Sequence, residues 1–425
     1  MDANPRFAHD KLREVLLAGL DEDERLRLHR QVAEAVETVY PGDRRYAAAL
    51  AHHWDGAGDS AQAMYYLGVA AHQALMASAY TEAIELFERV LDLLPGQQTP
   101  NTLGQRALVS QRIASAYWGL GQYDLSEKLY ADSLRWFREV DDRMGMADAL
   151  KGLGDVTRRR GDYADAKSYF LESLALCQEN GDPMSLAQAL ARVGLVARNQ
   201  GDVVEAESYY QQSLTIFQDA GLQQHTGSLM SGLGLVAADQ GNYALARQYM
   251  RASLEITRGL HNPTGTALVL TGLAWIEYLD GAYVEARTHS LESLRLSEAV
   301  GDRWMIGNNL GNLGKIVLAL GDEDDALDYL RQGLAVSMTI GATPLTLEIL
   351  PGVAKLWMRR GHHKRALSLL HLAVTHPATY YEVKQQAEPL LAQIRQVLSS
   401  EQIDAVVQTP LALESVLDEI IYGDI

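Results

Sequence analysis

Arginine side chains are concentrated in one part of this chain, in a pattern suited to binding an anion. Five of them lie close together in the sequence: Arg158, Arg159, Arg160, Arg192 and Arg198. A guanidinium group presents a planar fork of N–H donors that matches a carboxylate or a phosphate. The cluster therefore indicates a docking point for an acidic peptide or another carboxylate. The alternative is pairing within the chain, with acids such as Asp155 and Asp162, and compensation of charge at the end of a helix.

A second group combines aromatic rings with side-chain amides. It consists of Trp275, Tyr278, Asn308 and Asn312. Exposed rings supply apolar contact area, and amides hydrogen-bond to the backbone of an extended peptide. The group favours a surface that grips a peptide or a loop. The alternative is that Trp275 packs between helices.

Residues that could support catalysis or hold a metal do not form a recognisable pattern. His52 and His53 are adjacent, as are His362 and His363. Neighbouring side chains diverge on a helix, so neither pair chelates a metal by itself. The single cysteine, Cys177, lacks the surroundings of a nucleophile, and we expect it to be a small buried residue. We therefore expect no enzymatic activity, no metal and no cofactor.

The elements that position these residues repeat with a strict period. Glycine recurs at every fortieth residue: Gly121, Gly161, Gly201, Gly241, Gly281, Gly321 and Gly361. Other columns keep the same register, and around Gly161 they are an aliphatic residue, Leu153, and two small residues, Gly154 and Ala166. A period of this length is typical of a repeat array.

Each repeat contains two stretches with helical periodicity, one on either side of the glycine. We expect the glycine to end the first helix in a left-handed conformation, where the chain reverses. The small residues would then face each other at the closest approach of the two helices. A second break follows about half a period later at Gly181, Gly221, Gly301 and Gly341. The predicted unit is helix, turn, helix, turn.

Two further columns point to a known family. A bulky residue stands nine positions after the glycine, as in Tyr130, Phe170, Tyr210, Met250, Leu330 and Leu370, and a tyrosine often stands two positions after it. The set resembles the tetratricopeptide repeat, although the usual unit has 34 residues. The resemblance implies an all-α fold, a right-handed superhelical solenoid of helix hairpins with a 40-residue period. Seven such repeats would fill residues 101–375.

In tetratricopeptide superhelices the first helix of each pair lines the concave surface. The resemblance therefore implies a groove that binds a protein or peptide. Its candidate residues are Trp118, Lys151, Asp155, Arg158, Arg159, Arg192, Arg198, Asn199, Trp275, Tyr278, Asn308, Asn312, Lys315, Lys355 and Arg359.

The residues before the array resemble a different class of protein. Phrases such as FAHDKLREVLLAGL and LAHHWDGAGD look like the passage that joins the ATPase core to the repeats in bacterial STAND-type signal-transducing ATPases. We assign residues 1–45 to this helical connector, with Asp21 as a helix cap, and residues 46–100 to divergent helical hairpins. The sequence has no phosphate-binding loop of the form G-x-x-x-x-G-K-[ST]. The resemblance thus implies an ATPase domain elsewhere, in cis or in trans, and a chain that is a fragment of a larger protein.

The last segment, residues 376–425, also leaves the 40-residue phase. It reads as capping helices that cover the final apolar face of the array, with Ser399 as a cap signal. The alternative is a docking segment for another domain or chain. Its apolar stripe would be Leu411, Leu413, Val416, Leu417, Ile420 and Ile421.

Charge and cysteine content restrict the partners and the compartment. A formal net charge of −18 disfavours binding to nucleic acid or to an anionic membrane. One cysteine and no secretory signal fit a cytoplasmic protein. The leading interpretation is a non-catalytic sensor of a STAND-type ATPase, acting in bacterial signal transduction, either in defence or in transcription regulation. The alternative is a free-standing scaffold that assembles several proteins. An oligomer is compatible with either interpretation.

Overall fold

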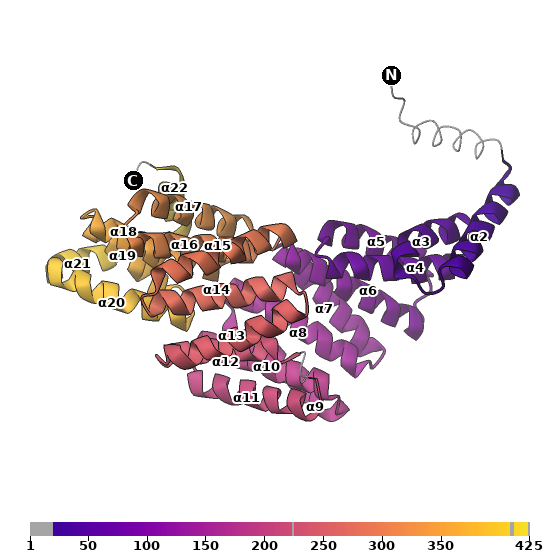
Figure 1. Cartoon of the computed structure of the whole chain (residues 1–425), viewed down its shortest axis with the longest axis horizontal. Coiled ribbons are helices and arrows are strands. Elements are labelled where there is room, and N and C mark those ends of the chain that lie inside the picture. The colour runs from indigo at the N-terminus through magenta and orange to yellow at the C-terminus, as the bar shows by residue number, and fades with distance from the viewer. Residues whose placement is uncertain (1–19, 223–224, 409–411, 424–425) are drawn as a thin grey trace, which may run out of the picture. The chain divides into compact units, whose positions relative to one another are not determined.

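The computed structural model describes residues 20–222, 225–408 and 412–423. Residues 1–19 of the expected connector and Leu411 of the apolar stripe lie outside these ranges. Within them, every regular element is a helix (Figure 1). None of these described helices is both long and apolar enough to cross a membrane. The all-α prediction is confirmed.

The contacts divide the chain into two compact units, Met1–Ala116 and Tyr117–Ile425. The elements of the first unit are α2 (Glu22–Val39), a 3₁₀ turn (Arg44–Tyr46), α3 (Ala47–Gly56), α4 (Ser60–Met76) and α5 (Tyr80–Leu93). Helix α6 (Pro100–Gly119) begins in the first unit and ends in the second. Asp21 caps α2 as expected, because its carboxylate accepts from the Glu24 amide at 2.8 Å.

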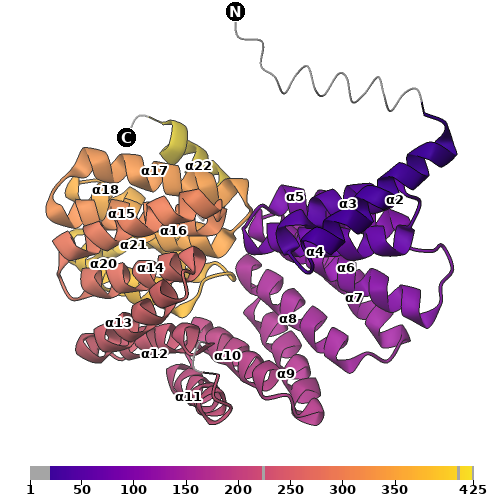
Figure 2. The same cartoon turned by 45° about the vertical axis from the view of Figure 1, so that its right-hand side comes forward.

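The second unit is a succession of helix hairpins that follow one another along the chain (Figures 1 and 2). Its helices are α7 (Tyr123–Glu139), α8 (Arg143–Arg160), α9 (Tyr163–Asn180), α10 (Pro183–Gln200), α11 (Val203–Asp219), α12 (Gly227–Asp239), α13 (Tyr243–Gly259), α14 (Pro263–Leu279), α15 (Tyr283–Val300), α16 (Arg303–Leu320), α17 (Glu323–Thr339), α18 (Thr343–Arg359), α19 (His363–Thr375), α20 (Tyr381–Val397), α21 (Ser400–Val407) and α22 (Leu413–Tyr422). The predicted helix–turn–helix–turn unit is confirmed.

The turn glycines adopt the conformation that the period predicts. All seven have positive φ, from 74° at Gly121 to 101° at Gly321. The second turn of the repeat is also left-handed, and there the structure adds two positions that carry no glycine. Asp141 and His261 stand in the same column as Gly181 and have φ of 54° and 51°. The turn geometry therefore persists where the glycine signal is lost.

Close packing inside each hairpin explains the small-residue columns. A Cβ added to Gly194 would lie 3.2 Å from the carbonyl oxygen of Ala206, and one added to Gly234 would lie 3.2 Å from that of Ala246. The bulky column fills the neighbouring space, since Phe170 and Met250 are fully buried. The small residues do mark the closest approach of the paired helices, as predicted.

A buried serine also joins the two helices of four successive hairpins. Ser173, Ser213, Ser253 and Ser293 each donate to a backbone carbonyl on the first helix of their own hairpin, over 2.6–2.8 Å. Their side chains are completely buried. The hydroxyl satisfies its own hydrogen-bonding need inside the apolar core and fixes the register of the hairpin.

The C-terminal helices cover parts of the array. Ser399 caps α21 through a capping box, and α22 buries Val416, Leu417 and Ile420 while packing on α17. Arg331 of α17 donates to the carbonyl of Ile420 over 2.8 Å. Three residues of the apolar stripe, Val416, Leu417 and Ile420, are therefore covered by the chain itself, while Leu413 and Ile421 are half-buried. Helix α20 differs, because it contacts α18, α19 and α10.

Candidate binding groove

The first helices of successive hairpins form one connected layer. Helix α8 contacts α10, and the contacts continue through α12, α14 and α16 to α18, which in turn contacts α8. We call these six helices the inner layer. The carboxyl-terminal halves of these helices carry most of the candidate residues, so the expected groove corresponds to this layer.

A segment from the carboxyl-terminal part of the chain lies against the inner layer. We call residues 376–389 the docked segment. Tyr163 donates through its hydroxyl to the carbonyl of Ala378 over 3.2 Å. A Cβ on Gly161 would lie 2.7 Å from the Ala378 Cα, and one on Gly201 would lie 2.7 Å from the Tyr381 ring. Two of the turn glycines thus also make room for the docked segment.

Two clefts remain beside the docked segment. One, of about 520 Å³, is lined by the turn after α8 and by Asn199, Tyr381 and Lys384. The other, of about 560 Å³, is lined by Asp239, Trp275 and Glu382, together with further residues of α20. Both clefts lie between the repeats and the docked segment, so a ligand in either would contact both.

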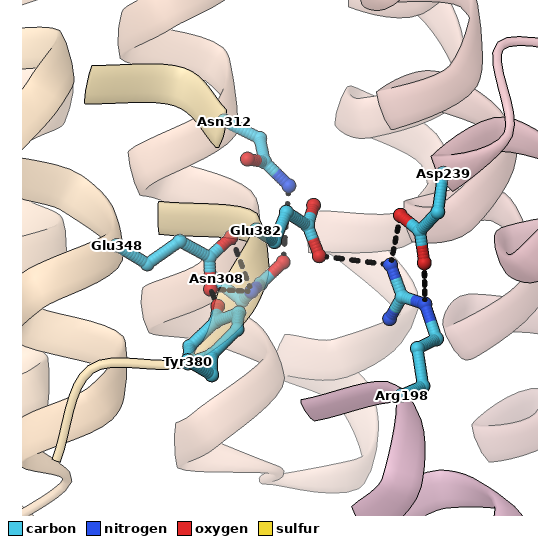
Figure 3. A network of polar contacts seen from close by, with 7 residues as sticks. All are labelled: Arg198, Asp239, Asn308, Asn312, Glu348, Tyr380 and Glu382. Carbon is cyan, nitrogen blue, oxygen red and sulfur yellow. Dashed lines mark hydrogen bonds and ion pairs between the residues drawn. The ribbon is translucent and has the colours of Figure 1, made fainter. Parts of the chain in front are cut away.

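A buried arginine connects the docked segment to the repeats. Arg198 donates two hydrogen bonds to Asp239, over 2.6 and 3.1 Å, and a third to Glu382 over 3.0 Å (Figure 3). The side chains of Arg198, Asp239 and Glu382 are only 8%, 5% and 13% exposed. The guanidinium fork therefore holds one acid from the array and one from the docked segment.

A second part of the network centres on Glu348 of α18 (Figure 3). Its carboxylate accepts from the Asn308 amide over 3.2 Å and from the hydroxyl of Tyr380. Asn312 donates to the side-chain oxygen of Asn308 over 3.0 Å. Helices α16 and α18 are in this way joined to the start of the docked segment.

Acids outnumber bases in this buried network. The pKa of Glu382 is raised to about 7, first by burial and then by the neighbouring Glu348 and Asp239, while Arg198 and Lys315 oppose the shift. Burial alone would lower the pKa of Arg198, but Asp239 and Glu382 together raise it above its ordinary value. Two cations thus face three carboxylates, and a proton on Glu382 balances the charge.

Other cations of the inner layer are buried without hydrogen bonds. In the part of the chain that the structure describes, Arg158 Nε, Arg159 Nε and Nη1 and Lys315 Nζ have no hydrogen-bond partner. Burial lowers the pKa of Arg158 to about 10, helped by Arg159 and Arg192. Buried N–H groups of this kind can donate hydrogen bonds to an anionic or carbonyl-rich ligand. The free-energy cost of removing them from water arises on folding, so ligand binding does not add it again.

Aromatic rings cover two of these cations. The Arg159 guanidinium lies 3.6 Å from the ring centre of Trp304 and 5.3 Å from that of Trp118. The Lys315 ammonium lies 5.0 Å from the ring centre of Trp275. The rings orient both cations without neutralising their charge.

The structure differs from the sequence prediction on exposure. Trp275, Asn308 and Asn312 were expected to be exposed, but they are 5%, 6% and 3% exposed. Trp275 stacks on Tyr278 at 5.3 Å, and Lys355 lies 5.9 Å from the ring centre of Tyr278. These residues are covered because the inner layer closes on itself and receives the docked segment.

The remaining candidates lie apart from the buried network. Arg192 pairs with Asp155 over 3.1 Å, and Lys151 pairs with Asp148 over 2.6 Å. The alternative of pairing within the chain therefore holds for Arg192, for Arg198 and for Arg160, which pairs with Asp124 and Glu127. Arg158 Nε also lies 4.0 Å from Asp155. Asn199 lines the 520 Å³ cleft and its side-chain oxygen has no hydrogen-bond partner among the described residues, while Arg359 is exposed.

Sequence reasoning missed Trp304, Tyr380 and Glu382. Trp304 lies at the start of α16, outside the positions expected to face the groove. Tyr380 and Glu382 were assigned to a cap, because nothing local distinguishes a covering helix from a segment inserted against the inner layer.

Solved structures with a similar fold include three that cover most of this chain. A Rap protein in complex with competence and sporulation factor has a TM-score of 0.59 at 13% identity, covering 89% of this chain and 98% of that one. NprR in complex with its cognate peptide NprX has a TM-score of 0.54 at 12% identity, covering 76% and 96%. A STAND ATPase with a tetratricopeptide repeat sensor from Pyrococcus horikoshii has a TM-score of 0.50 at 12% identity, covering 88% and 55%. At these identities the likeness concerns the fold.

Comparison of sequences adds the family. No curated protein sequence matches the chain significantly. A tetratricopeptide repeat model matches residues 105–179, 185–259, 225–299 and 265–338, and a second one matches residues 43–97. The ranges of the first model alone span more than half of the 425 residues. The chain therefore belongs to the tetratricopeptide repeat family.

Proposed function

We propose that this chain is a ligand-sensing module, the sensor of a STAND-type ATPase, which recognises a protein or peptide trigger at the inner layer. The observation that carries the proposal is the docked segment. It is a short turn, residues 376–380, followed by helix α20. Tyr163 of α9 binds the backbone carbonyl of Ala378, and the inner layer binds the hydroxyl of Tyr380 and the carboxylate of Glu382. A surface that binds its own chain in this way has the groups needed to bind another.

The chemistry of the surface favours a ligand that carries acidic groups. Arg158, Arg159 and Lys315 bring buried positive charge that the chain leaves without hydrogen bonds. A ligand carboxylate could bind there directly, or could replace Glu382 on Arg198. In the second case the ligand can bind only where the docked segment is released from Arg198. The ligand therefore shifts the population towards the form in which the segment is released.

The similar structures support the two parts of the proposal separately. Two of them are complexes with a peptide or a factor, and the third is an ATPase whose sensor is a tetratricopeptide array. We propose that residues 1–45 connect the sensor to an ATPase domain, in cis or in trans, and that residues 376–425 act as a cover that the ligand displaces in part. In this scheme the chain itself contributes no catalytic residue.

The binding part is tested with a library of acidic and neutral peptides and with purified protein. We expect acidic peptides to bind the wild type and to be lost from the double variant Arg158→Ala, Arg159→Ala. The matched control is Arg258→Ala, because Arg258 is an exposed arginine of α13 that pairs with Glu292. Equal binding by the inner-layer variant and the control would refute the inner layer as the site.

The sensor part needs a separate readout. The array is fused to a STAND ATPase core, and ATP hydrolysis is measured with and without a peptide that binds. A change in hydrolysis supports the sensor role. Unchanged hydrolysis, with intact peptide binding, would instead favour the scaffold interpretation.

A further inference from the structure

Three histidines meet between α2 and α3 in the first unit. His29 comes from α2, and His52 and His53 come from α3. One ligand atom from each ring lies within 4.8 Å of the other two. The sequence showed only the adjacent pair on α3, which cannot chelate a metal by itself. The fold adds the third imidazole from a helix 23 residues earlier in the chain.

The spacing of two of these imidazoles suits a tetrahedral metal. His29 Nδ1 and His53 Nδ1 are 3.2 Å apart. Two nitrogens bound to one Zn²⁺ at about 2.0–2.1 Å, with a tetrahedral angle between them, are separated by roughly 3.4 Å. This pair therefore stands close to the spacing that the metal requires. His52 is exposed, and rotation of its side chain can bring the third nitrogen into place.

The position of His29 is built into the packing of the two helices. Its ring lies directly over Gly56, the last residue of α3, where a Cβ would come within 2.7 Å of the ring atom Cε1. Any larger residue at this position would push the ring away. Burial lowers the pKa of His29, with His52 and Arg25 acting in the same direction, so the neutral form that binds metals is favoured.

We propose that His29, His52 and His53 form a binding site for a first-row divalent cation of the Zn²⁺ type. Three imidazoles and one open position, filled by water, are the ligand set of such a cation. Imidazole nitrogen selects Zn²⁺, Co²⁺, Ni²⁺ and Cu²⁺ over Mg²⁺ and Ca²⁺, which require oxygen ligands. Because the ligands come from two helices, the bound cation joins α2 to α3 and stabilises the first unit.

The test is a titration of the full chain with Co²⁺, whose visible absorption reports tetrahedral nitrogen coordination, followed by competition with Zn²⁺. We expect one equivalent to bind with an intense visible band, and Zn²⁺ to displace it. Mg²⁺ in excess should leave the band unchanged. Binding of this equivalent should raise the melting temperature of the first unit.

Three variants and a control make the assignment specific. His52→Ala removes an exposed ligand and should weaken the site on the order of tenfold or more without affecting folding. His29→Ala should abolish it, and Gly56→Ala should weaken it while all three histidines remain. The control is His72→Ala, an exposed histidine of α4 in the same unit. Retention of the same Co²⁺ band and affinity in His52→Ala and Gly56→Ala would overturn the proposal, as would loss of the band in the control.

Discussion

Glu382→Gln is the substitution that tests the charge balance of the buried network most directly. Glutamine keeps the shape of the side chain and imitates the protonated acid, but it cannot ionise. In the wild type, the ionised form of Glu382 adds a third carboxylate to Asp239 and Glu348, against the cations Arg198 and Lys315. We therefore expect the variant to hold the docked segment as firmly as the wild type in acid, and more firmly above neutral pH.

The size of the effect follows from the pKa shift. Glu382 has a pKa of 4.5 in the unfolded chain and a pKa of about 7 in the folded one. A folded-state pKa above the unfolded value means that the contribution to stability is complete below pH 4.5 and is lost as the pH rises through 7. The difference corresponds to about 3 kcal/mol, at 1.36 kcal/mol per pKa unit. Glutamine should remove this pH-dependent loss.

Hydrogen exchange of α20 is the suitable assay, because repeat arrays open locally rather than as one unit. Protection of α20 is compared at pH values from 5 to 8, after correction for the intrinsic exchange rate. Glu388→Gln is the matched control, since Glu388 lies in the same helix and is exposed. The reasoning is refuted if wild type and Glu382→Gln keep the same difference in protection at every pH, or if the variant loses protection as the pH rises.

Three further substitutions test the packing. Gly161→Ala introduces a Cβ at φ 97° that overlaps the docked segment, so it should lower the protection of α20. It should also lower the melting temperature more than Gly281→Ala, where φ is 82° but the space is open. Equal effects of the two variants in thermal unfolding would exclude the close approach. Ser213→Ala removes the buried hydrogen bond to the Ala187 carbonyl, which keeps its partner within α10, and should cost about 0.5–1.5 kcal/mol in urea unfolding. Phe170→Ala empties a fully buried site and should cost about 3–5 kcal/mol; a loss below 1 kcal/mol would mean that the hairpin collapses around the gap.

The repeats could be predicted from the sequence because each of their signals is local. A turn glycine, its small neighbours and a bulky residue lie within one repeat, and their physical meaning does not depend on distant parts of the chain. Where the same conformation is held without its usual residue, as at Asp141 and His261, the period alone places the turn. The buried serine column was visible in the sequence as well, but serine is common on helix surfaces, so its role emerges only from the carbonyl opposite it.

The candidate site depends on contacts that are not local, so the sequence supports it less. The register of the repeats identifies which positions face the inner layer, and Arg198, Asn308 and Lys315 do lie there. Their burial depends on a contact between residues 184 positions apart in the chain, Arg198 and Glu382. No periodicity within a repeat encodes such a contact. The same limit applies to His29, which joins the histidines of α3 only through the packing of two helices.

The buried network contacts the docked segment through polar and ionisable side chains. Apolar side chains would cover the inner layer at least as stably, because the desolvation of an ion pair offsets most of its attraction. The contact between Arg198 and Glu382 differs from an apolar contact in one respect. A ligand with its own carboxylate can take the place of Glu382 on Arg198, so that the buried arginine keeps a partner. Arg159 Nε and Nη1 and Lys315 Nζ have no hydrogen-bond partner among the described residues, so they offer a ligand interactions that the docked segment does not use. In the sensor that we propose, such a surface would give up some stability of the form that holds the docked segment and would lower the barrier to exchanging the segment for a ligand.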